Sequence, residues 1–202
     1  MRRSAEQTRE HVLEVAHELF YWHGIRATGV DRVAAEAGIA PTTLYRLFAS
    51  KDDLVAAYIE RAFRLYREWF DIAAGSGGAL PRDQILAVFD ALAEQVQPHQ
   101  CRGCPFLMAL AEFPDAEHPA RQVAIEMKTW VRERMGELAE QFAATAPVAD
   151  SVTAPVADPV ADPGELADHL ALLMEGVYAS AQALGHLGPA RRARTLAAVL
   201  LG

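Results

Sequence analysis

The sequence lacks any long hydrophobic run. Its apolar stretches are shorter than the roughly 18–20 residues that cross a bilayer. Met1-Arg-Arg-Ser leads into a polar segment rather than into the apolar core of a signal peptide. We therefore expect a cytoplasmic protein that makes no use of a membrane. Cysteine is scarce as well, because Cys101 and Cys104 are the only two, and this excludes a disulfide scaffold.

An excess of positive charge is also missing, which at first argues against binding to nucleic acid. The formal net charge is −8. However, residues 1–70 hold 10 basic and 10 acidic residues, whereas residues 71–202 hold 9 and 17. All the negative excess therefore lies outside the N-terminal third, so that clustered arginines in this third can still face phosphate.

Motifs of common enzymes do not occur: there is no Gly-x-Ser-x-Gly elbow, Walker loop or His-Glu-x-x-His helix. Cys101 and Cys104, with His99 and His118 nearby, are residue types that bind zinc, but a second CxxC pair is missing. We therefore expect no enzyme, no metal site and no cofactor. Two interpretations of the cysteines stay open. They fill the core at a helix that begins at Cys104, or they form a redox pair, since a thiol near a helix N-terminus can have a lowered pKa.

Apolar residues recur at three- and four-residue steps along the chain, which predicts helices and no strand, and hence an all-α fold. Gly38 follows the second predicted helix directly, where a left-handed turn costs least without a Cβ. Thr28 to Asp31 and Ser50 to Asp53 match capping boxes. The first four helices are expected at residues 6–22, at about 29–37, from Pro41 onward, and from 51 to about 75.

The second half is also predicted to be helical, apart from one segment. Residues 145–163 nearly repeat a proline-containing eight-residue unit, through which neither a helix nor a central strand can run, so a flexible surface loop is expected. Two closing helices follow, at about 165–184 and 189–201.

A helix-turn-helix is the pattern with functional content. It needs a small residue where its two short helices cross, a glycine at the turn and apolar anchors under the second helix. Five residues meet these requirements: Ala34, Gly38, Ile39, Leu44 and Leu47. By itself this spacing also fits an ordinary helical hairpin, and an all-helical interaction module without DNA binding stays an alternative.

A longer pattern is more specific. Leu19-Phe20-x-x-His23-Gly24-x-x-Ala27-Thr28-x-x-Asp31-x-Val33-Ala34, followed by Gly38-Ile39-x₃-Thr43-Leu44-Tyr45-x-x-Phe48-x-Ser50-Lys51-x-x-Leu54, resembles the N-terminal domain of TetR-family transcriptional regulators. The resemblance implies a helix-turn-helix DNA-binding domain over residues 1–50 and a helical effector-binding and dimerisation domain over residues 51–202. It also implies a DNA operator and a small-molecule effector as partners.

The resemblance assigns roles to residues of the helix-turn-helix. Thr42 and Thr43 are similar to positions that face base edges, and Tyr45 and Lys51 to positions that contact phosphate. Arg46 is expected at a guanine edge or a phosphate. Arg32 and Thr28 are expected to touch the flanking DNA backbone.

The second domain is expected to bind an effector and a second copy of the chain. In the resembled family the last helices form a four-helix dimer interface, for which we predict Leu170, Leu173, Gly176, Val177, Ala181 and Leu184. Apolar residues in this family also line the effector pocket, for which we predict Phe89, Phe106, Met127, Trp130, Met174 and Tyr178. The family's usual mode implies a repressor that its effector releases from the operator. A thiol-based sensor that uses Cys101 and Cys104 is the alternative.

Overall fold

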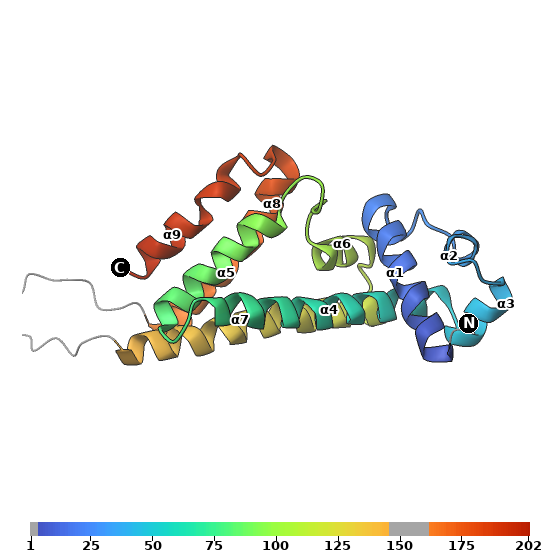
Figure 1. Cartoon of the computed structure of the whole chain (residues 1–202), viewed down its shortest axis with the longest axis horizontal. Coiled ribbons are helices and arrows are strands. Elements are labelled where there is room, and N and C mark those ends of the chain that lie inside the picture. Colours follow the sequence, from blue (N-terminus) through green and yellow to red (C-terminus); the bar gives the residue numbers. More distant parts are fainter. Residues whose placement is uncertain (1–3, 146–161) are drawn as a thin grey trace, which may run out of the picture. The chain divides into compact units, whose positions relative to one another are not determined.

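The computed structural model describes residues 4–145 and 162–202, and these residues form helices and turns without a strand (Figure 1). The predicted all-α fold is confirmed. The helices are α1 (Ala5–His23), α2 (Val30–Glu36), α3 (Pro41–Leu47), α4 (Lys51–Ser76), α5 (Pro81–Gln95), α6 (Pro105–Glu112), α7 (Pro119–Thr145), α8 (Pro163–Leu184), the short 3₁₀ helix η1 (Pro189–Arg192) and α9 (Ala193–Leu200). Most of the repeat segment predicted as a loop, residues 146–161, lies outside the described residues. Within the described parts of the chain, no helix combines the length and apolar character needed to cross a membrane.

The helices form two compact units. The first unit contains the residues up to Tyr66 together with Cys104–Met127, and the second contains Arg67–Gly103 and Lys128–Gly202. The units therefore do not divide at residue 50, where the sequence suggested a domain boundary. The start of α4, all of α6 and the start of α7 share a core with the three N-terminal helices.

Aromatic side chains explain why these segments cluster in the first unit. The ring of Phe20 on α1 lies edge-on to Tyr58 on α4, with 5.5 Å between ring centroids. Phe106 on α6 lies edge-on to Phe63 and Tyr66 at 6.5 and 6.1 Å. All five rings are buried, and such aromatic pairs stabilise a core beyond their buried area. Burial raises the pKa of the Tyr58 phenol above its ordinary value, because the charged phenolate would lose its hydration there.

Side-chain hydrogen bonds cap the starts of α1 and α4, but not the start of α2. The Ser4 hydroxyl accepts the Gln7 N–H at 3.1 Å at the start of α1, and the Ser50 hydroxyl accepts the Asp53 N–H at 3.0 Å at the start of α4. The predicted cap at Thr28 is wrong. Gly29 is the N-cap of α2 and provides no side chain, whereas the buried Thr28 hydroxyl donates back to the Gly24 carbonyl at 2.9 Å.

The second unit packs α5, α8, η1 and α9 against one another. Its core contains Phe89 and Leu92 from α5, Leu170 and Met174 from α8, and Ala197 from α9. The two predicted closing helices are confirmed as α8 and α9, although a 3₁₀ turn forms the first part of the second one.

Candidate nucleic-acid interface

The α2–α3 pair has the geometry of a helix-turn-helix (Figure 1). Gly38 adopts a φ of 66°, and its N–H donates to the Ala35 carbonyl at 3.0 Å. The next N–H, of Ile39, donates to the Ala34 carbonyl at 3.0 Å and closes the turn. Ala34 and Leu44 are buried, as expected for the small contact residue and the apolar anchor of such a motif.

This turn permits a direct test of its backbone conformation. We expect Gly38→Ala to destabilise the protein by about 1–2 kcal/mol, because a Cβ strains a left-handed residue. No atom lies within 4 Å of the added Cβ, so sterics with neighbours play no part. Gly75, exposed on α4 with equally open surroundings, is the matched control. Gly75→Ala should stabilise by about 0.5–1 kcal/mol, because alanine is the better helix former. Urea denaturation of both variants measures the two changes in the free energy of unfolding. If both substitutions changed it in the same direction, the left-handed conformation of Gly38 would be contradicted.

One face of α3 is free for contact with a ligand. Leu44 is buried and holds the helix to the unit, while Thr42, Tyr45 and Arg46 are exposed. Residues three and four apart share one face of a helix, so these three side chains form a single surface. Tyr45 exposes 51% of its surface, although it is a large aromatic side chain. Thr43 is half-buried at the edge of this surface.

Of the two residues expected to touch the flanking DNA backbone, one is exposed and the other is buried. Arg32 is exposed on α2. Thr28, in contrast, has 0% exposure, and its hydroxyl contacts the main-chain carbonyls of Gly24, in the same turn, and of Leu19, on α1. We therefore correct the expectation for Thr28, because a buried side chain cannot touch a DNA backbone. Its hydroxyl stabilises the turn between α1 and α2 instead.

Lys51 begins α4 and lies half-buried. Its ammonium group donates to the carbonyl oxygen of Arg26 at 3.3 Å. A lysine ammonium has three donors, so this contact leaves capacity for an anion. Asp52 and Asp53 follow in the first turn of α4, where carboxylates interact favourably with the helix dipole but repel phosphate.

The six residues predicted for an effector pocket are distributed over both units. Phe106 and Met127 belong to the first unit, and Phe89, Trp130, Met174 and Tyr178 to the second. Trp130 is half-buried and the other five are buried. Near them in the second unit, the Lys128 ammonium lies 2.6 Å from Oε1 of Glu175, and the Tyr178 hydroxyl donates to Gln95.

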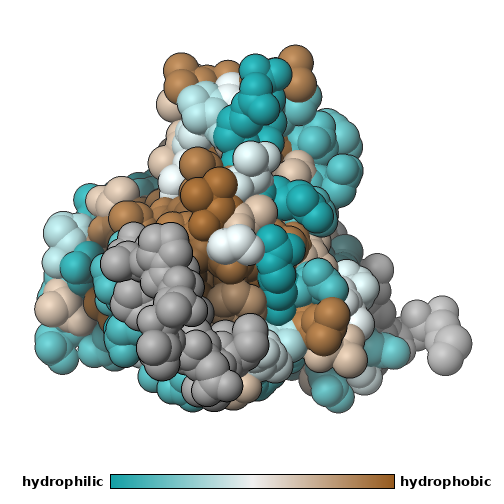
Figure 2. Space-filling model, turned by 90° about the vertical axis from the view of Figure 1, so that its left-hand side faces the viewer, coloured by the Kyte–Doolittle hydropathy of each residue, from teal (hydrophilic) through white to brown (hydrophobic). Residues whose placement is uncertain are grey.

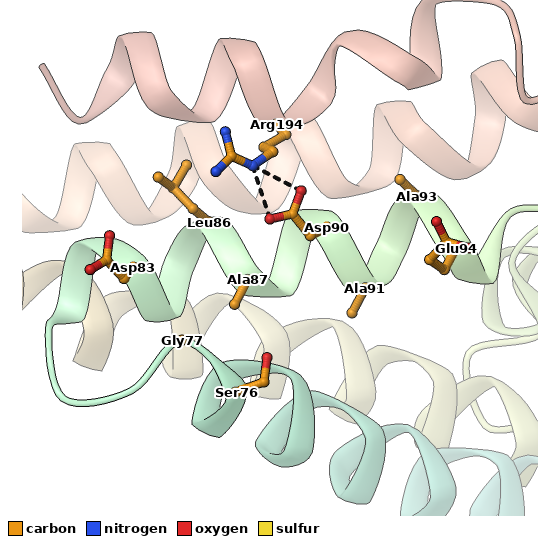
Figure 3. Close-up of a pocket in the computed structure, with 10 residues that line it drawn as sticks. All are labelled: Ser76, Gly77, Asp83, Leu86, Ala87, Asp90, Ala91, Ala93, Glu94 and Arg194. Carbon is orange, nitrogen blue, oxygen red and sulfur yellow. Dashed lines mark hydrogen bonds and ion pairs between the residues drawn. The ribbon is translucent and has the colours of Figure 1, made fainter.

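An open groove of about 570 Å³ lies elsewhere in the second unit (Figure 3). It runs along α5, past Asp83, Asp90 and Glu94, and none of the six predicted residues lines it. Arg194 of α9 reaches over the groove to Asp90, with 2.8 Å between Nε and Oδ1. Acidic and small side chains line most of this surface, which differs from the apolar enclosure typical of an organic ligand site.

The predicted dimer residues fall on different sides of α8. Leu170 and Val177 are buried in the core of the second unit, with 0% and 2% exposure. They pack within one chain and are unavailable to a partner, which corrects the prediction for these two. Leu173 and Ala181 are half-buried, while Gly176 and Leu184 are exposed. Other exposed apolar residues are Leu172, Ala179 and Ala183 on α8 and Leu196, Val199 and Leu200 on α9.

Cys101 and Cys104 are not joined in a disulfide bond. Cys104 is the N-cap of α6 and has 3% exposure, so it lies buried at a helix start, as expected for a residue that fills the core. The helix itself buries only Phe106 and Ala109. Cys101 is half-buried, with Sγ 3.8 Å from the Gly103 carbonyl. The redox alternative stays a prediction. Among the residues that the structure describes, no three His, Cys, Asp or Glu side chains are placed to hold a metal ion.

Comparison with known proteins identifies the motif. Residues 12–58 match the family model for bacterial regulatory proteins of the tetR family, and residues 81–197, more than half of the chain, match the C-terminal domain of tetracyclin repressor-like proteins. The chain belongs to the TetR family. It is thus a DNA-binding transcriptional regulator and not an enzyme, as the sequence predicted.

Known proteins resemble this chain in two ways: in part of the sequence, and in the fold of nearly the whole chain. An HTH-type transcriptional regulator of Staphylococcus aureus (strain USA300) is 38% identical over 66 residues, which is 33% of this chain and 36% of that protein. The match thus spans about a third of the relative's length. Among solved structures, a TetR-family regulator from Streptomyces coelicolor is 29% identical with a TM-score of 0.76, over 96% of this chain and 92% of that one. A putative TetR regulator from Streptomyces avermitilis is 28% identical with a TM-score of 0.71, over 94% and 95% of the two chains.

Proposed function

We propose that this TetR-family regulator binds its operator as a homodimer through α3 and that a small-molecule effector releases it. The observation that carries the proposal is the exposed face of Thr42, Tyr45 and Arg46 above the buried Leu44. A helix fixed by an apolar anchor can enter the major groove with its polar face toward the bases.

Each residue predicted to contact DNA, apart from Thr28, has a proposed role. Thr42 and Thr43 contact base edges, while Tyr45 and Lys51 bind phosphate. Arg46 contacts a guanine edge or a phosphate, and Arg32 contacts the flanking backbone. The side chains of these residues can donate hydrogen bonds. Phosphate oxygens and the major-groove edge of guanine are acceptors, so they need such donors.

A dimer is proposed because a single helix-turn-helix covers only a few base pairs. The exposed apolar surface on α8 and α9 supports this. Leu172 and Val199 each expose 71% of their surface, and a contiguous apolar surface of this kind is suited to a protein partner. Figure 2, seen from the end that holds the C-terminus, shows hydrophobic side chains next to hydrophilic ones on this face. Gly176, Ala179 and Ala183 would let two copies of α8 approach closely.

The effector is proposed to lie among the buried aromatic and sulfur-containing residues of the second unit. Phe89, Trp130, Met174 and Tyr178 supply an apolar lining. The Oε2 atom of Glu175 is buried and has no hydrogen-bond partner, so it can accept a donor from a ligand. An apolar site with few polar groups is typical for small organic molecules.

The experiment selects fragments of the source genome with the purified protein and titrates the best fragment by fluorescence anisotropy. We expect a near-palindrome with half-sites about 10 base pairs or a multiple of this apart, and an affinity that falls steeply with salt. A small molecule that releases the protein must bind more weakly in the presence of operator by the same factor. Equal binding to a scrambled fragment, or a single unrepeated site, would contradict the proposal.

A further inference from the structure

The turn that joins α1 to α2 depends on side chains from outside itself. Within the turn, the Gly24 carbonyl accepts the Thr28 hydroxyl, and the Ile25 carbonyl accepts the Thr28 N–H at 3.3 Å. The N–H groups of Ile25 and Arg26 have no such local acceptor. Ile25 is buried, whereas Arg26 is exposed. A main-chain N–H that is withdrawn from water without an acceptor costs about 1–3 kcal/mol, so the Ile25 N–H needs an acceptor from elsewhere in the chain.

Glu112, the last residue of α6, supplies both acceptors. Its Oε1 accepts the Ile25 N–H at 3.0 Å, and its Oε2 accepts the Arg26 N–H at 2.6 Å. The contact joins residues 86 and 87 positions apart in the sequence. The carboxylate thus holds two successive N–H groups in the manner of a bound anion.

This position is unfavourable for a glutamate on local grounds. A negative charge at the C-terminal end of a helix meets the negative end of the helix dipole. Two charge-assisted hydrogen bonds outweigh that cost, since bonds of this kind are about twice as strong as neutral ones. The residue is therefore explained by its distant contact and not by the stability of α6.

Neighbouring contacts keep the carboxylate in place. Arg121 of α7 donates to the carbonyls of Leu110 and Phe113 at 3.3 and 3.2 Å, and so fixes the end of α6. The Arg26 guanidinium lies 5.7 Å from the centroid of the Phe113 ring. His118 stacks on Phe113 at 3.9 Å with 16° between the ring planes.

The carbonyl of the same residue, Arg26, is held by Lys51, the proposed phosphate contact. The Arg26 carbonyl accepts the Lys51 ammonium at 3.3 Å, while the Arg26 N–H donates to Glu112. The turn from which α2 and α3 extend is therefore fixed between α4 and α6. All these residues belong to the first unit.

We propose that Glu112 is a positioning residue for operator recognition: its carboxylate fixes the α1–α2 turn and thereby the orientation of the DNA-reading helices. This inference rests on the proposed DNA-binding role of α3. Without the carboxylate, the two N–H groups form an empty anion site that a small carboxylate such as formate can occupy.

The test compares Glu112→Ala, Glu112→Gln and the control Glu117→Ala in the full-length protein. Glu117 is an exposed carboxylate in the loop before α7, so its removal changes the net charge equally. We expect Glu112→Ala to bind the selected operator about tenfold more weakly, which corresponds to the loss of one charge-assisted hydrogen bond or more. Glu112→Gln keeps one acceptor and should lose about threefold on the same scale. Glu117→Ala should bind like the wild type.

Rescue by formate distinguishes positioning from a general loss of stability. Sodium formate is compared with the same concentration of sodium chloride, because operator binding depends on salt. Formate should restore affinity in Glu112→Ala and slow amide hydrogen exchange at Ile25 and Arg26. It should do neither in Glu112→Gln, whose amide fills the site.

The outcomes separate this inference from the proposed function. If the wild type selects no operator, the proposed function fails. If the wild type binds and Glu112→Ala binds within twofold of it, or if formate leaves the exchange of both amides unchanged, the positioning role is wrong while the proposed function stands.

Discussion

Operator binding will fall at least about 100-fold when Tyr45 and Arg46 are both replaced by alanine. A hydrogen bond to a charged group contributes about 1.5–3 kcal/mol. Because both subunits of a dimer carry the substitution, each replaced side chain removes two such contacts from the complex. Both side chains are exposed on α3, so their removal leaves the core intact. If both contact phosphate, the slope of log affinity against log salt should also become less steep, by about one unit per lost contact. Anisotropy titrations at several salt concentrations measure both effects.

Arg64→Ala is the control for the change in charge. Arg64 lies on α4 in the same unit, is 57% exposed and is 3.6 Å from Glu10. Surface ion pairs of this kind contribute little to stability, so this variant should bind operator like the wild type. If it lost as much affinity as the double variant, the loss would reflect overall charge and not the face of α3.

The second large effect is expected for Gly176→Arg. Gly176 is exposed in the middle of α8, and no atom lies within 4 Å of a Cβ added there. A single chain therefore accommodates the arginine, whereas the proposed interface would bury two of them against each other. We expect a folded monomer and a loss of operator affinity of at least about 100-fold, because the second half-site no longer binds within the same complex.

Light scattering after size-exclusion chromatography measures the assembly, and circular dichroism measures the helix content. Gln141→Arg, at an exposed position on α7, adds the same charge to the same unit and should leave the dimer unchanged. A Gly176→Arg protein that stays dimeric and binds operator normally would place the dimer interface on another surface.

Local signals in the sequence predicted most of the helix boundaries. Pro41 begins α3 because its missing N–H is not needed in a first turn. Gly38 takes the left-handed conformation that a tight turn requires. Both signals act within a few residues, so no knowledge of packing is needed to use them.

Thr28 shows where the local pattern failed. Its spacing from Asp31 suited a capping box, yet its side chain is buried and bonds to the preceding turn. Leu170 and Val177 failed for a related reason: the apolar positions of α8 extend around the helix, and periodicity does not tell which of them face the chain's own core. Position in the packed unit decides both cases.

By itself, the sequence determined the all-α fold, the helix-turn-helix and the family, because caps, turn glycines and helical periodicity act between residues close in the chain. Only the tertiary structure decided which face of α8 is exposed, that Thr28 is unavailable to DNA, and that Glu112 binds the turn after α1. No spacing rule connects positions 86 residues apart. Such contacts form because folding leaves main-chain N–H groups that must find an acceptor, and the packing of distant helices determines which side chain provides it.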